Sequence, residues 1–152
     1  MKKALAATLL LGVVILGQVA GASADNPTRM SANIPFAFHA GNKLVPAGEY
    51  VFEMTAIGAY SATGTTLAIH NRDGSIFLYV NAILGDVHTF NPAANVTFTR
   101  YGGTYFLSEV QSGRIKSCLP KTNHEKELAL AYSKESGQGG SKELIEISSF
   151  QR

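Results

Sequence analysis

Turn-forming sequences recur at short intervals through most of the chain, and this spacing constrains the fold more than any other feature. Val45-Pro46-Ala47-Gly48 has the signature of a type I turn, and Arg72-Asp73-Gly74 and Gly102-Gly103 are suited to hairpin turns. Turns about 8–12 residues apart are typical of β-sandwiches and β-barrels. We therefore expect an all-β fold.

The segments between these turns predict short strands. After a polar lead-in over residues 25–31, we expect strands over residues 33–38, 49–55, 65–71, 75–84, 95–101, 104–111, 114–119 and 143–150. Pro35 cannot donate a hydrogen bond to a neighbouring strand, so the first segment should lie at a sheet edge or at the start of a strand. Together the segments indicate an antiparallel sandwich or barrel of about seven to nine strands.

Two of these segments have different hydrophobic patterns. In residues 49–55, Tyr50, Phe52 and Met54 face one way and polar residues face the other, which predicts a half-buried strand. Residues 75–84 are apolar on both faces. A strand of this kind is expected in the middle of a packed sheet and not at its edge.

One short helix is expected near the C-terminus. Thr122 and Glu125 fit a capping box, in which Thr122 bonds the amide of Glu125 and the Glu125 side chain reaches back. The residues after Leu128 match both strand and helix spacing, and we expect the helix to run from residue 122 to about residue 130. Residues 136–141 are rich in glycine and serine and should form a flexible loop.

The N-terminal residues predict export. Lys2 and Lys3 precede an uncharged apolar run over residues 4–17. Ala22 and Ala24 then supply the small residues that a signal peptidase requires before its cleavage site. This order of basic, apolar and small residues is typical of a secretory signal peptide.

We expect residues 1–24 to be a signal peptide that is cleaved before Asp25. A single mature domain over residues 25–152 would remain, in the periplasm or outside the cell, with no stable membrane insertion. The alternative is an uncleaved membrane anchor, since residues 4–21 approach the length that spans a bilayer.

Cleavage would change the charge of the protein. Loss of Lys2 and Lys3 lowers the 13 Lys and Arg residues to 11, against 11 Asp and Glu. A neutral domain has no basic stripe to contact phosphates, so we expect neither nucleic acid nor an anionic lipid surface as its partner. Cys118 is the one cysteine. In an oxidising compartment it would be a buried thiol or would form a disulfide with another chain.

Five stretches of the chain carry a resemblance to known proteins. They are Ile34-Pro35-Phe36-Ala37-Phe38, Gly41-Asn42-Lys43, Val45-Pro46-Ala47-Gly48-Glu49-Tyr50, Tyr105-Phe106-Leu107-Ser108-Glu109-Val110, and Leu119-Pro120-Lys121 running on to Glu125-Lys126-Glu127-Leu128. In this order they resemble a group of small, exported, functionally uncharacterised bacterial β-rich proteins with F-x-F, P-A-G-x-Y and Y-F-L-S-E-V motifs. The resemblance implies a secreted β-domain and brings no activity with it.

The residues that could carry chemistry do not form a recognisable catalytic or metal-binding motif. His124 begins a sequence like the HExxH zinc motif, but Leu128 stands at the second ligand position. Glu49 and Glu53 share one strand face and are interpreted as its solvated side. Cys118 lies close before the expected helix and is interpreted as a structural thiol. We expect no catalytic residue, no metal site and no cofactor.

Three functional hypotheses remain open. The first is an exported non-catalytic domain, a binding or structural module that contacts an envelope polymer or another protein. The second is a β-barrel carrier of a small apolar ligand, which the two apolar faces of residues 75–84 would allow. The third is a hydrolase with a site built from loops. Exposed rings would favour the binding module, and the candidates are Tyr60, Phe77, Tyr79, Phe90, Tyr101 and Tyr105.

Overall fold

The computed structural model describes residues 28–55, 64–85, 91–113, 115–137 and 141–146. Within these ranges the chain forms ten strands and one helix, so the prediction of an all-β fold with one helix near the C-terminus is confirmed. The strands are β1 (Thr28–Ile34), β2 (Phe38–Ala40), β3 (Lys43–Val45), β4 (Gly48–Thr55), β5 (Thr65–Asn71), β6 (Phe77–Leu84), β7 (Asn91–Tyr101), β8 (Thr104–Gly113), β9 (Ile115–Cys118) and β10 (Ser141–Glu146), and α1 (Asn123–Ser136) lies between the last two.

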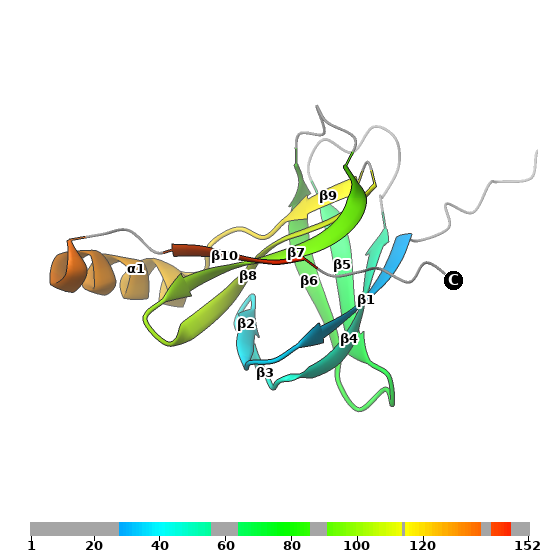
Figure 1. Ribbon diagram of the computed structural model, residues 1–152, viewed down its shortest axis with the longest axis horizontal. Coiled ribbons are helices and arrows are strands. Elements are labelled where there is room, and N and C mark those ends of the chain that lie inside the picture. The colour runs from blue at the N-terminus through cyan, green and yellow to red at the C-terminus, as the bar shows by residue number, and fades with distance from the viewer. Residues whose placement is uncertain (1–27, 56–63, 86–90, 114, 138–140, 147–152) are drawn as a thin grey trace, which may run out of the picture.

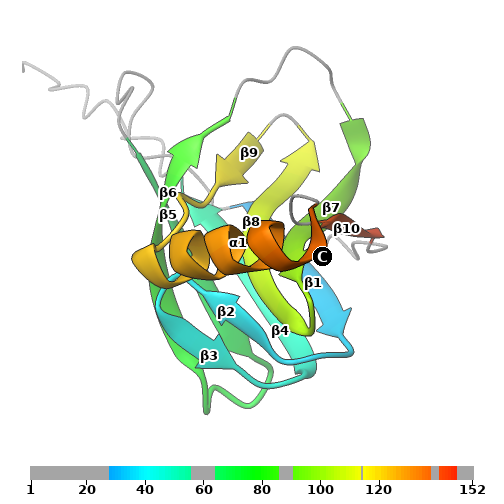
Figure 2. The same ribbon diagram turned by 90° about the vertical axis from the view of Figure 1, so that its left-hand side faces the viewer.

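Hydrogen bonds connect all ten strands, and the sheet bends into two layers without closing. Its main path runs β1-β4-β5-β6-β9-β8-β2-β3, and β7 pairs with β8 and with β10. Strand β6 joins the layers, because it pairs with β5 and, through its last two residues, with β9. Figures 1 and 2 show β7, β8 and β10 crossing β1 and β4 as a second layer. The result is a sandwich-like fold.

The first expected strand is divided in two. Strand β1 begins at Thr28, inside the expected polar lead-in, and ends at Ile34, directly before Pro35. It lies at the edge of the sheet, as Pro35 predicted. The chain resumes as β2 at Phe38, turns through Gly41 at a φ of 60°, and returns as β3. These two three-residue strands were not expected, and they raise the strand count to ten.

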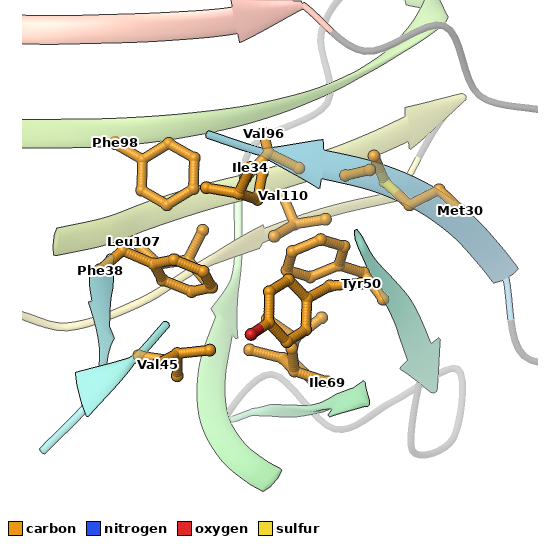
Figure 3. Close-up of a cluster of buried hydrophobic side chains, with 14 of the residues drawn as sticks. Met30, Ile34, Phe38, Val45, Tyr50, Ile69, Val96, Phe98, Leu107 and Val110 are labelled. Atoms are coloured by element: carbon orange, nitrogen blue, oxygen red, sulfur yellow. The ribbon is translucent and has the colours of Figure 1, made fainter. Parts of the chain in front are cut away.

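The core lies between the two layers (Figure 3). It is built by inward-facing residues of the half-sheets, with Tyr50, Phe52 and Met54 from β4 facing Phe98 and Val110 from β7 and β8. Strand β4 is therefore half-buried, as its pattern predicted. Aromatic rings contact one another edge to face, including Phe38 with Phe98 at a centroid distance of 5.2 Å. Such pairs stabilise a core beyond the area they bury.

Helix α1 begins where the capping box predicted. Thr122 is its N-cap, and the Thr122 Oγ1 accepts a hydrogen bond from the Glu125 amide at 3.1 Å. The helix continues to Ser136 and not to about residue 130, because its first strong C-terminal signal is Gly137, which adopts the left-handed conformation at a φ of 66°. The expected flexible loop thus overlaps the helix end, and residues 138–140 lie outside the described residues.

The remaining expected strands are confirmed with shifted ends. The turns at Arg72-Asp73-Gly74 and Gly102-Gly103 connect β5 to β6 and β7 to β8. Strand β9 ends at Cys118, before Pro120. The last strand covers Ser141–Glu146, two residues earlier than expected, and residues 147–152 lie outside the described residues.

Candidate functional site: the β6 groove

Strand β6 is the most exposed apolar strand among the described elements. Its residues Phe77 to Ala82 pair with β5, and only Ile83 and Leu84 pair on the other edge, with β9. The side chains of Phe77, Tyr79 and Ile83 are 52%, 71% and 51% exposed, while Leu78 and Val80 pack against the core. Strand β6 lies in the middle of the sheet order, between β5 and β9, as its apolar pattern predicted. Its outer face is nevertheless exposed, and no described element packs over it.

A hollow of about 320 Å³ lies beside this strand edge, and we call it the β6 groove. Residues 78–81 of β6 form one wall, and residues 40–43 of the β2–β3 turn form the other. Leu119, Pro120 and Thr122, from the segment between β9 and α1, complete the lining. The groove therefore joins three parts of the chain that are far apart in sequence.

Close packing holds the two walls in place. A Cβ atom added to Gly41 would lie 3.5 Å from Cγ1 of Val80, so the tip of the β2–β3 turn contacts β6. The Leu119 amide donates a 2.9 Å hydrogen bond to the carbonyl of Ser108 in β8. Ser108 is the extra residue where the β7–β8 register shifts between Thr97 and Phe98.

The charged residue among the described residues that line the groove is Lys43. Its side chain is exposed and forms no ion pair with the described carboxylates. Asn42 and Asn81 add side-chain amides, which can both donate and accept hydrogen bonds. The lining is otherwise mostly apolar, so the groove suits a partly apolar ligand with a negative group.

A polar network adjoins the groove at the start of α1. Lys121 donates a 2.9 Å hydrogen bond to the Tyr101 hydroxyl, and that hydroxyl donates to Oε1 of Glu125 at 3.4 Å. Tyr101 and Glu125 are only 3% and 5% exposed. The network ties the N-terminus of α1 to the β7–β8 hairpin.

Burial sets the electrostatics of this network. Burial raises the pKa of the Glu125 carboxyl, while the Lys121 charge, the Tyr101 hydroxyl and the Thr122 amide oppose the rise. The bond to Tyr101 raises the pKa of Lys121, which keeps its ammonium charged. The bond from the Glu125 amide to Thr122 is the half of the capping box that the structure shows, and the neighbouring groups offset only part of the cost of burying the Glu125 charge.

Two histidines that are distant in sequence meet beside the network. The rings of His39 in β2 and His124 in α1 lie 5.4 Å apart between centroids, and His39 stacks on Phe106. Burial, and then the nearby His124, lower the pKa of His39. His39 lies in β2, a strand that was not expected, so no pattern in the sequence predicted this pair.

The other candidate residues have structural contacts. Glu49 and Glu53 do not form a carboxylate pair, because Glu49 meets Arg72 at 3.8 Å and Glu53 meets both Arg29 at 2.8 Å and His70 at 3.2 Å. Cys118 is half-buried and not fully buried as expected. His88 lies outside the described residues, as do Ala22, Ala24 and Asp25 at the expected cleavage site.

The described residues contain no group of three or more His, Cys, Asp or Glu side chains arranged to hold a metal ion. Within the same ranges, no helix has the length and apolar character needed to cross a membrane.

Comparison with known proteins identifies no relative of this chain. No protein-family model, curated protein or solved structure matches the chain.

The sequence missed the site because its parts come from separate segments. Strands β2 and β3, which bring residues 40–43 to the groove, were not expected, and Leu119 was expected only as the end of a strand over residues 114–119. The one usable signal was the second apolar row of residues 75–84, in which Phe77 and Tyr79 belong to the outer face. Tyr101, also a candidate exposed ring, is buried.

Proposed function

We propose that this protein is an exported, non-catalytic β-domain of the cell envelope or extracellular space that binds another protein or a surface polymer. The binding surface in this proposal is the outer face of β6 together with the β6 groove. The N-terminal sequence of residues 1–24 supports export, and the exposed strand supports binding.

The observation that carries the proposal is the exposed apolar row on β6. Phe77, Tyr79 and Ile83 lie on the outer face of this strand and are each more than 50% exposed, and the rings of Phe77 and Tyr79 contact each other at 4.8 Å. Contiguous apolar surface of this kind marks interaction sites in soluble domains. Aromatic side chains are also enriched at the centres of protein interfaces.

The two other hypotheses have less support. An apolar carrier needs an internal cavity, but the Phe98 ring in the core contacts the rings of Phe36 and Phe38, each at a centroid distance of 5.2 Å. A hydrolase needs catalytic groups that reach a substrate, but Tyr101 and Glu125 are buried and bonded to each other. The contacts of this network instead anchor a helix.

Fractionation of the native host tests the proposed function. We expect the wild-type protein to co-purify with an envelope polymer or protein, and Tyr79→Lys to be released from it. Leu130→Lys is the matched control, because Leu130 is 62% exposed on α1 and lies outside the groove lining. Release of both variants, or a wild-type protein that binds nothing, would contradict the proposal.

A further inference from the structure

The edge of β6 that faces the groove offers unpaired backbone groups. Successive residues of an antiparallel strand direct their N–H and C=O groups to alternate sides. From Phe77 to Ala82, β6 pairs only with β5, so alternate residues direct these groups away from β5 with no strand partner among the described residues. Such an edge accepts an additional strand from another chain.

The groove is large enough for a short segment of chain. Its volume of about 320 Å³ is at the lower end of the roughly 300–1,000 Å³ found for ligand pockets. Leu78, Val80 and Leu119 give it an apolar lining beside the strand edge. An extended segment could therefore place an apolar side chain in the groove while its backbone pairs with β6.

The charge of Lys43 favours an acidic peptide over a second copy of this chain as the occupant of the groove. Lys43 lines the groove without an ion pair to the described carboxylates, so a ligand with a carboxylate would complement it. A second copy of this chain pairing through its own β6 would bring residues Phe77–Leu84, which include no acidic residue. A peptide with an acidic side chain fits the groove better than a second β6.

We propose that the β6 groove binds an extended peptide segment that adds to β6 as a further strand and pairs an acidic side chain with Lys43. This inference rests on the proposed function and names the partner of the same surface. Main-chain hydrogen bonds to β6 supply affinity, and the apolar lining and Lys43 select the side chains.

Binding of synthetic peptides tests the inference, with the protein purified in the form that its native host produces. The probe is a capped octapeptide of alternating valine and threonine with one central aspartate, and binding is measured by calorimetry and by NMR shifts of β6 amides. One matched peptide has lysine in place of aspartate. Another is N-methylated at alternate residues, so that it cannot donate backbone hydrogen bonds along one edge.

We expect the aspartate peptide to bind, with the largest shifts at residues 78–81 and 40–43. N-methylation should weaken binding about tenfold or more, because two or three hydrogen bonds are lost. Replacing aspartate with lysine should weaken it about threefold to fivefold, as expected for one exposed ion pair.

Charge reversal in the protein gives the decisive pair of variants. Lys43→Glu should weaken the aspartate peptide and strengthen the lysine peptide, each about threefold to fivefold. The control Lys126→Glu reverses an exposed charge on α1, away from the groove lining, and should change neither affinity.

Four results would overturn the inference. Equal binding of the N-methylated peptide would exclude strand addition, and equal binding to Lys43→Glu would exclude the ion pair. A doubled mass in sedimentation that Tyr79→Lys abolishes would assign the groove to a second copy. If no peptide binds while Tyr79→Lys still releases the native partner, the peptide inference fails and the proposed function stands.

Discussion

Strands β4 and β6 flank β5 in the same sheet, yet they differ in what lies around them. Strand β4 pairs along its length with β1 on one edge and with β5 on the other. Its outward residues include Glu49 and Glu53, which meet cationic side chains. Strand β6 pairs fully on one edge only, and its outward residues are largely apolar.

The difference shows what a hydrophobic pattern can determine. In both strands the pattern correctly identifies a row that faces the core. A second apolar row can face either another layer of the same protein or a binding partner. The sequence pattern is the same in both cases. Here the described residues provide no such layer over β6, so its second row indicates a binding surface.

The largest expected effect is on the free energy of unfolding, which a truncation in β4 should lower much more than a truncation in β6. Phe52 in β4 is fully buried, so Phe52→Ala should lower the free energy of unfolding by about 3–5 kcal/mol. Tyr79→Ala in β6 should change it by about 0.5 kcal/mol or less, because that side chain is mostly exposed. Urea denaturation measures both, and equal losses would contradict the difference in burial between the two side chains.

Local signals in the sequence predicted most of the fold. The turns, the capping box at Thr122 and the alternation around Tyr50 each depend on a few neighbouring residues, and each is confirmed. Strand β3 and the exposure of Tyr79 depend on contacts between distant segments. The groove is built from such contacts, and for this reason it could not be predicted.

A smaller effect concerns the outward face of β4. Glu53 is bonded to Arg29 and His70 on the neighbouring strands, so Glu53→Gln should lower the free energy of unfolding by about 0.5–1 kcal/mol. Asn81→Ala, on the outward row of β6, is the matched control and should cost less. Urea denaturation at low and high salt measures both, and a loss that salt does not diminish would contradict an ion-pair origin.

The smallest effect is a dependence of stability on pH that arises at His39 in β2, outside the groove lining. The pKa of His39 is lowered below 6.5 in the folded protein, so the unfolded chain binds the proton more tightly. Stability should therefore be complete above about pH 6.5 and fall as the pH drops toward the folded pKa. His39→Asn should reduce the change in the free energy of unfolding between pH 5 and pH 7, measured by denaturation at each pH. An unchanged slope would show that another group causes this pH dependence.

The most direct test of an open edge on β6 is amide hydrogen exchange of the unliganded protein, followed residue by residue by NMR. We predict that amides along β4 are protected on both edges. From Phe77 to Ala82 of β6, protected amides should alternate with rapidly exchanging ones, because only those facing β5 are bonded. Uniform protection along β6 in the monomer would show that its edge is already covered and would contradict the account.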